Sequence, residues 1–395
     1  MTELRELFLK KLSKNEKIAY DLNHYLAENP ELSGQEYNSV KKITELLRKK
    51  GIEVEDKVAG LDTSFRARIT KSHEDKPKFG IIMEYDALPE IGHACGHSAS
   101  GSLSLLAALT LWEMKDSFDA TVDLIGTPDE EVMGAKIPMA KAGVFDDYDS
   151  VLMIHMNSNE TLPAVHFLAL SEIKVSFKGI TSHAAAAPWD GKNALNAAIL
   201  TTNAIDMMRQ QLKPDTRVSY IITNGGQASN VIPGEAEMII NMRNSSKFDL
   251  EDTVQKVMNC IKGASIATDI EYTTALTGPE FEDMNINDAG SEAIKMIMDS
   301  INLPYVEEKQ GQATGSSDIG TVSYVCPAFH PMLAISDHYF SLHTKEVADR
   351  MKSDSINGVI SQGAKVIGLF ILKAIEDPTL LKEIKEEFQK STLAN

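Results

Sequence analysis

The stretch EYDALPEIGHACGHSASG, from Glu84 to Gly101, gathers acidic side chains, histidines and a cysteine within a few residues. The run KFGIIM before it is typical of a buried strand, and SLSLLAALTLW after it is typical of a helix. Asp86, Cys95 and His97 are therefore expected in a loop where a strand ends. Thiolate, imidazole and carboxylate groups are the ligands that zinc prefers in proteins. Metal binding is thus one chemistry that this stretch could perform.

Two further strands are followed or ended by similar groups. Glu130 and Glu131 are adjacent in GTPDEEV, after the strand-like run ATVDLIGT, and the run SVLMIHM ends at His155. Open α/β sheets place their sites at the carboxyl ends of strands. A single histidine is more often a buried polar residue, and a glutamate pair is more often an exposed loop. Three such groups at three strand ends favour a metal site.

The adjacent glutamates suggest a division of labour. Consecutive residues of an extended segment point in opposite directions, so one of the two carboxylates could bind a metal while its neighbour faces the substrate. A free carboxylate can take a proton from a water molecule whose pKa the metal has lowered. Amide hydrolysis is the reaction that this arrangement favours.

The elements that must position these residues form an α/β pattern. Two amphipathic helices, separated near Pro30, precede strands that alternate with helices. From about Ala169 the pattern becomes β-α-β-β-α-β, which is typical of a compact unit with an antiparallel sheet. With 395 residues, the chain is long enough for two domains. We predict a discontinuous catalytic domain, residues 1–170 and 279–395, and an inserted domain, residues 171–278.

Composition excludes several classes of protein. A formal net charge of −18 argues against nucleic-acid binding, which depends on clustered lysine and arginine. No uninterrupted apolar run is long enough to span a membrane, and the charged N-terminus lacks the apolar core of a signal peptide. The three cysteines, Cys95, Cys260 and Cys326, are too few for a disulfide framework. A cytoplasmic protein is expected.

Several motifs together resemble a known family. DALPEIGHACGH, TPDEE, the strand end at His155 and GITSHAAAAPWDGKNALNAAI are similar to the aminoacylase and carboxypeptidase-G family of two-zinc amidohydrolases, metallopeptidase family M-20. The nearest branch holds p-aminobenzoyl-glutamate hydrolases, β-alanyl-dipeptide-type dipeptidases and staphylococcal HmrA-type amidohydrolases. The resemblance implies a zinc-exopeptidase-like catalytic domain, with a mixed sheet flanked by helices, and an inserted α+β, ferredoxin-like lid. It also implies pairing of subunits through the lid, as a homodimer or within a homotetramer.

The resemblance further implies a cofactor and a reaction. Two divalent ions per subunit are expected, Zn²⁺ or alternatively Mn²⁺, and the reaction is hydrolysis of the amide bond of N-acyl amino acids or small peptides. Glu130 would be the general base, and Asp86 would orient the metal ligands. The residues matching the family's metal ligands before the lid are Cys95, His97, Glu131 and His155.

The last metal ligand in this family is a histidine late in the chain. His343, in LHTKEVADRM, best matches a His-Thr pair followed by an acidic residue and a helix. His330 and His338 are the alternatives, and the sequence favours His343 over both.

The resemblance also assigns roles within the lid. His183, in SHAA, would reach the active site of the partner subunit and stabilise the oxyanion, while Asn230 and Arg243 would hold a substrate carboxylate. Two positions depart from the family pattern. Glu84 stands where many relatives have a histidine, and Ser98 stands where aspartate or asparagine is common.

Two other functions remain as alternatives. Cys95 could be the nucleophile of a cysteine amidase, activated by His93 or His97. That hypothesis leaves Glu130, Glu131 and His155 unexplained. The chain could instead be an inactive homologue that only binds its ligand, but the proposed base and ligands are all present.

Overall fold

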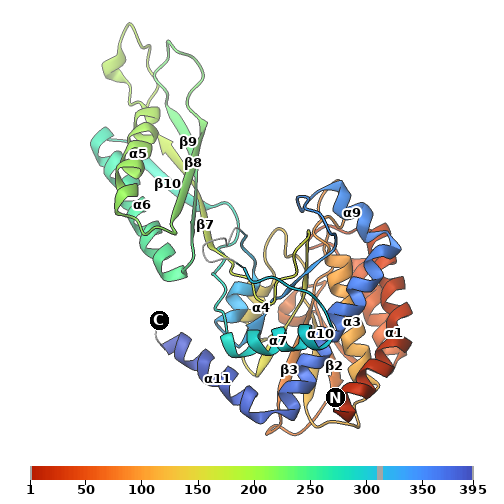
Figure 1. Cartoon of the computed structure of the whole chain (residues 1–395). Coiled ribbons are helices and arrows are strands. Elements are labelled where there is room, and N and C mark those ends of the chain that lie inside the picture. The colour runs from red at the N-terminus through yellow and green to blue at the C-terminus, as the bar shows by residue number, and fades with distance from the viewer. Residues whose placement is uncertain (1, 309–314, 394–395) are drawn as a thin grey trace. The chain divides into compact units, whose positions relative to one another are not determined.

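The computed structural model describes residues 2–308 and 315–393 (Figure 1). These residues form two compact units. The inserted unit comprises residues 167–283 and 315–317, and the main unit comprises the other described residues. The predicted inserted domain, residues 171–278, lies within the range 167–283 of the inserted unit.

The main unit contains a mixed sheet with the strand order β1-β2-β4-β3-β5-β11. The strand β3 pairs in parallel with β4 and β5, and β11 pairs in parallel with β5, whereas β1 and β2 are antiparallel to their neighbours. The bounds of these strands are β1 Glu53–Asp56, β2 Phe65–Thr70, β3 Lys78–Met83, β4 Thr121–Gly126, β5 Ser150–Leu152 and β11 Ala328–Phe329. The predicted strand SVLMIHM is divided, because its second half pairs elsewhere as β6, His155–Asn157, with β12, Met332–Ala334.

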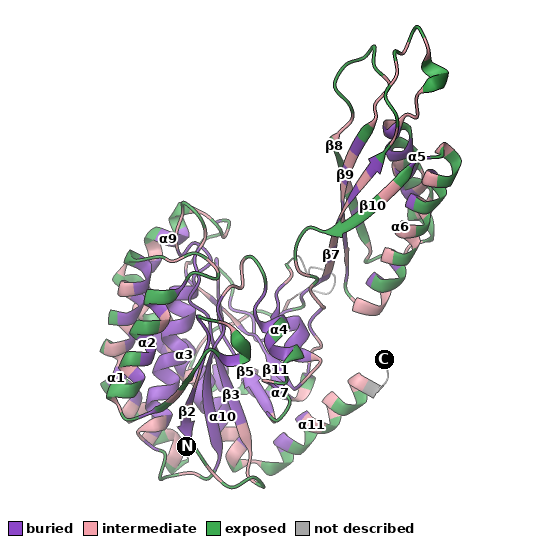
Figure 2. Cartoon of the chain, turned by 180° about the vertical axis from the view of Figure 1, so that it is seen from behind, coloured by how far each residue is buried: buried purple, intermediate pink, exposed green. Residues whose placement is uncertain are grey.

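Helices of the main unit cover this sheet. The central helix α3, His97–Trp112, packs on β2, β3 and β4, and both α1, Glu3–Glu28, and α10, Asn357–Glu376, pack on α3 (Figure 1). Residues 97–111 of α3 are all buried. Figure 2 shows this buried layer of strands and helices in purple. The other helices of the unit are α2 Tyr37–Lys49, α4 Lys136–Lys141, α7 Asp288–Ser300, α8 Ile319–Ser323, α9 Lys345–Met351 and α11 Pro378–Leu393, with 3₁₀ turns at Val58–Gly60 and Asp354–Ile356.

The C-terminal region differs from the prediction in two respects. The segment Asp354–Glu376 is long and apolar enough to cross a membrane by length and composition, yet 67% of its most apolar window is buried inside the chain, as in a core helix. The apolar pattern SDSINGVISQGAKVIGLFILKAI predicts this helix as the last element of the catalytic domain, and that prediction was wrong. A further helix, α11, starts at Pro378, where proline fits the first turn because it needs no hydrogen-bond partner there.

The inserted unit has the predicted β-α-β-β-α-β order. Its strands form an antiparallel sheet ordered β10-β7-β9-β8, with Val175 opposite Met238 at the centre. Both helices pack on β7 and β9, and the alternating burial along β7 places every second side chain against them. The elements are β7 Ala169–Lys178, α5 Ala194–Met208, β8 Arg217–Asn224, β9 Glu235–Asn244, α6 Lys247–Thr268 and β10 Glu271–Leu276, with 3₁₀ turns at Pro188–Asp190 and Arg209–Gln211.

Candidate active site

The ends of the parallel strands bring the predicted site residues together. The loop after β3 carries Asp86 and Cys95 and leads into α3, whose first residue is His97, and the turn after β4 carries the glutamate pair. The two loops start side by side, because the Thr127 backbone N–H donates to the Met83 carbonyl at 2.9 Å. Parallel pairing of β3 with β4 therefore positions the first two groups of candidate residues on one edge.

Gly96 allows Cys95 and His97 to face the same site. Its φ of +93° is in the left-handed region, which favours glycine. A Cβ atom at this position would also lie 2.5 Å from the Cγ of Met156, on the strand that carries His155. The glycine therefore supplies both the sharp turn at the start of α3 and the close approach of β6.

Cys95 lies at the centre of the candidate metal ligands. Its Sγ is 3.3 Å from Nε2 of His155 and 3.3 Å from Nε2 of His343. The same Nε2 atom of His343 is 3.6 Å from Oε1 of Glu131. Tetrahedral ligands of one zinc ion lie roughly 3.3–3.6 Å apart, given bonds of about 2.0–2.3 Å. Two donor sets therefore share the thiol, Cys95–His97–His155 and Cys95–Glu131–His343.

Hydrogen bonds orient the imidazole rings of two of these residues. Nδ1 of His155 lies 2.7 Å from the Met156 carbonyl, and Nδ1 of His97 lies 3.1 Å from the backbone carbonyl of Asp86. The Oδ1 atom of Asp86 is a further close neighbour of this nitrogen, at 2.9 Å. An Nδ1–H that donates in this way leaves the lone pair on Nε2, the nitrogen that faces Cys95 or the cluster. Asp86 thus lies directly beside the His97 ring, and its orienting role stays a prediction. Ser98, the residue that departs from the family pattern, is buried in α3 and is not needed to orient His97.

Among the three late histidines, the structure places His343 beside Cys95. His343 has a left-handed φ of +60°, and its backbone N–H donates to the Ala94 carbonyl at 3.0 Å. His338 is exposed and lies 2.9 Å from Asp337 and 3.5 Å from Glu346. His330 is buried with its ring stacked on His155, 5.7 Å between centroids. The geometry favours His343 as the last ligand.

The conformation of the glutamate pair differs from the prediction. Asp129 has a left-handed φ of +55°, and Glu130 and Glu131 lie in a turn instead of an extended segment. The extended alternation was wrong, but the carboxylates still have different neighbours. The Glu131 carboxylate lies close to Cys95 and His343. The Glu130 carboxylate lies close to Glu84 and Asp318, and these three residues form a second, acidic group.

A buried lysine pairs with two carboxylates of this second group, and none of the sequence motifs pointed to it. Lys136 is fully buried, and its Nζ lies 2.6 Å from Oε1 of Glu84 and 2.7 Å from Oδ1 of Asp318. Burial would raise the pKa of Glu84, but the nearby Lys136 and His97 lower it to about 2. Burial, together with Asp318 and Glu84, raises the pKa of Glu130 well above its usual value. A lysine inside the apolar run GAKIPMA was the available signal.

Replacing Lys136 with Met is expected to lower the free energy of unfolding by about 3–5 kcal/mol, because it leaves buried carboxylates without their cation. Adding Asp318→Asn to Lys136→Met should recover part of this loss. Urea unfolding followed by circular dichroism measures both, with Lys141→Met, exposed in the same helix, as the control. A loss below about 1 kcal/mol for Lys136→Met would contradict a paired, charged lysine.

The chemistry of the cluster fits divalent metal ions. Nε2 of His97 and Oε1 of Glu131 are buried and have no hydrogen-bond partner among the described residues. Buried polar atoms without a partner are costly, and a bound cation would satisfy both. The thiol, imidazole and carboxylate donors are those that zinc prefers. The five predicted ligands are therefore chemically suited to hold divalent ions.

The predicted substrate residues of the inserted unit do not meet within one chain. His183 and Asn230 lie on adjacent exposed loops, since His183 pairs with Val231. Arg243 lies near the other end of β9, roughly 27 Å from that strand's start at Glu235. There its Nε donates to Oδ1 of Asn241 at 3.3 Å.

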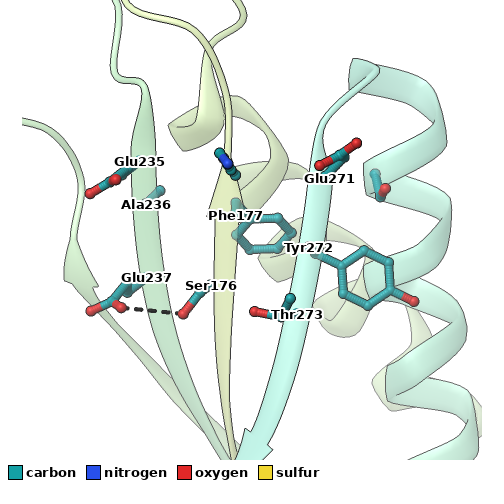
Figure 3. Close-up of a pocket in the computed structure, with 10 residues that line it drawn as sticks. Ser176, Phe177, Glu235, Ala236, Glu237, Glu271, Tyr272 and Thr273 are labelled. Carbon is teal, nitrogen blue, oxygen red and sulfur yellow. Dashed lines mark hydrogen bonds between the residues drawn. The ribbon is translucent and has the colours of Figure 1, made fainter.

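A separate hollow of about 620 Å³ lies in the inserted unit, between β9, β7 and β10 and the helix α6 (Figure 3). Glu235, Glu237 and Glu271 line it, and Ser176 donates to Glu237 at 3.2 Å. None of the predicted site residues lines this hollow.

Comparisons with known proteins agree with this architecture. Residues 169–268 match the family model described as a peptidase dimerisation domain, M20_dimer. The chain is 32% identical over 340 residues to the Xaa-Arg dipeptidase of Mus musculus, covering 84% of this chain and 78% of that protein. It is 29% identical to one of the subunits of the p-aminobenzoyl-glutamate hydrolase of Escherichia coli, covering 63% of this chain and 55% of that protein.

Solved structures show the same fold. The Bacillus subtilis YXEP protein, described as a dinuclear metal binding peptidase from the M20 family, aligns with a TM-score of 0.72. The alignment covers 92% of this chain and 99% of that one, at 19% identity. The predicted mixed sheet with flanking helices and an inserted dimerisation-type domain is therefore confirmed.

Proposed function

The chain belongs to the M20 peptidase family, and from that premise we propose that it hydrolyses the amide bond of a dipeptide or N-acyl amino acid at a two-metal site. One observation carries the proposal. Cys95 lies within 3.3 Å of both His155 and His343, with His97 and the glutamate pair in the same cluster.

The residues of the cluster have distinct proposed roles. Cys95, His97, His155, Glu131 and His343 would hold two ions, Zn²⁺ or alternatively Mn²⁺. When bound, such ions polarise a carbonyl and lower the pKa of water. The Glu130 carboxylate accepts a proton from the attacking water and returns it to the nitrogen of the leaving amine. Asp86 holds His97 in the tautomer that leaves Nε2 available.

The proposed substrate is a dipeptide whose C-terminal residue is arginine or another cationic residue. A relative that covers 84% of this chain at 32% identity is named an Xaa-Arg dipeptidase. The net charge of −18 also supports a cationic substrate, since a negative field raises the rate of encounter with positive ligands. Arg243 and Asn230 are proposed to bind the terminal carboxylate.

The inserted unit is proposed to pair two chains as a homodimer. Its edge strand β8 exposes Ile221 and Ile222, and α5 exposes Ile199, Leu200 and Met207. An unpaired strand edge with exposed apolar neighbours is a suitable interface. Pairing would allow His183 to serve the site of the partner subunit. Sedimentation velocity of the full chain tests the assembly.

The proposal is tested by metal content and hydrolysis measured on the same preparation. Protein purified without chelator should contain about two ions per chain and should cleave an Xaa-Arg dipeptide. N-acetyl amino acids and p-aminobenzoyl-glutamate complete the substrate panel. Removing the ions should abolish cleavage, and adding Zn²⁺ or Mn²⁺ should restore it. Unchanged cleavage after complete removal of the ions would contradict the proposal and favour Cys95 as a nucleophile.

A further inference from the structure

The turn that presents Glu130 begins with an unfavourable backbone conformation. Asp129 is left-handed, which costs a non-glycine residue roughly 1–2 kcal/mol, although aspartate tolerates it better than most. Within the turn, the Gly134 N–H donates to the Asp129 carbonyl at 2.8 Å, and the Met133 N–H donates to Oδ1 of Asp129 at 3.2 Å. Contacts from outside the turn must also hold it.

Glu36 holds the start of this turn from a distant part of the sequence. Its Oε1 accepts the backbone N–H of Asp129 and that of Gly34, each at 2.8 Å. Its Oε2 accepts the hydroxyl of Thr63 at 2.8 Å. The residue is fully buried. One side chain therefore joins three segments, and the turn is one of them.

A second connection from the same N-terminal loop reaches the other side of Glu130. Ser33 donates its hydroxyl to Oδ2 of Asp86 at 2.8 Å, and the same oxygen accepts the backbone N–H of Glu131 at 3.1 Å. The backbone is thus held at Asp129 by Glu36 and at Glu131 by Asp86. Glu130 lies between these two points.

We infer that Glu36 is a positioning residue, which fixes the turn carrying Glu130 and Glu131 through hydrogen bonds to its backbone. The inference rests on the proposed function, since these glutamates matter only if the chain is the hydrolase. Glu36 acts through the turn, and its hydrogen bonds are the basis of its effect. A misplacement of about 1 Å at a reacting group can cost about 100-fold in rate.

Two replacements of similar volume separate the hydrogen bonds from the charge. In Glu36→Gln, the amide oxygen can accept both backbone N–H groups, and the amide NH₂ can donate to the Thr63 hydroxyl once that hydroxyl rotates. In Glu36→Met, all three hydrogen bonds are lost. Glu31 offers a matched control, because its carboxylate also accepts several hydrogen bonds, from Asn38 and Ser39, but none from the turn.

The test measures kcat, KM and the rate of zinc release to a chelator for the full chain and the variants Glu36→Met, Glu36→Gln and Glu31→Ala. We expect Glu36→Met to lower kcat at least 30-fold, on the order of the cost of misplacement, and to release zinc faster. Glu36→Gln should keep most of the kcat of the unchanged chain and should release zinc at nearly the same rate as the unchanged chain. Glu31→Ala should lower the melting temperature without a comparable change in kcat.

Two outcomes would overturn the inference. One is a folded Glu36→Met protein with the kcat and zinc release of the unchanged chain. The other is a folded Glu36→Gln protein whose kcat falls by about 30-fold or more, the size of the loss expected when the hydrogen bonds are removed. This second result remains informative even if Glu36→Met fails to fold. An unchanged chain that binds two ions but cleaves no amide would instead overturn the proposed function.

Discussion

Replacing Glu130 with Gln is expected to lower kcat by about 1,000-fold, within the usual contribution of a general base, while two ions remain bound. Glutamine has nearly the same shape but cannot take the proton of the attacking water. Glu130 lies within 4.8 Å of the ligand atoms of His97 and Glu131, so the reacting water would be within its reach. Steady-state kinetics and metal analysis on one preparation measure both quantities.

The control for this experiment is Glu160→Gln, an exposed glutamate of the main unit. It should leave kcat and metal content unchanged, since it takes no part in the cluster. Turnover retained in Glu130→Gln would show that another group moves the proton. A chain that only binds its ligand would bind equally well with either residue and would show no turnover before the change.

Replacing Cys95 with Ala is expected to remove at least one of two ions and to lower kcat by 1,000-fold or more, on the scale of a lost catalytic metal. The reason is the position of Sγ, 3.3 Å from Nε2 of His155 and of His343, where it belongs to both donor sets. Removal of the thiol leaves each set one ligand short. Metal content after gel filtration, measured beside kcat, checks the expectation.

The same variant distinguishes the metal mechanism from a cysteine nucleophile. A nucleophile could be removed without loss of metal, so a Cys95→Ala protein that keeps both ions but has no activity would favour the cysteine amidase. Burial raises the pKa of the Cys95 thiol well above its usual value, the opposite of an activated nucleophile. The control is Cys260→Ser, in a helix of the inserted unit, which should change neither the metal content nor kcat.

Local pattern was sufficient to predict most of the fold. Period-two and helical patterns identified the β-α-β-β-α-β order of the inserted unit, because burial alternates along β7 and β9 and the buried residues of α6 recur at helical spacing. The division of SVLMIHM into β5 and β6 could not be predicted in this way. It depends on separate pairing with β11 and β12, which lie more than 150 residues later.

The site was predictable where strand ends carry its residues. Cys95, His97, Glu131 and His155 follow strands that meet on one edge, so their proximity was expected from the topology. Glu36 and Lys136 were missed for a physical reason. Each acts through partners far away in the sequence, such as Asp129 for Glu36 and Asp318 for Lys136.

The placement of α10 near the C-terminus delays the folding of the main unit while the chain is still being synthesised. This helix packs on both α1 and α3, so the core of the main unit stays open until residue 376 has emerged. His343 follows His155 by about 190 residues, which takes roughly 10–40 s at ribosomal rates of 5–20 residues per second. The strands and helices of the inserted unit, residues 169–276, can meanwhile fold. The cluster around Cys95 is therefore completed only after nearly the whole chain has been made.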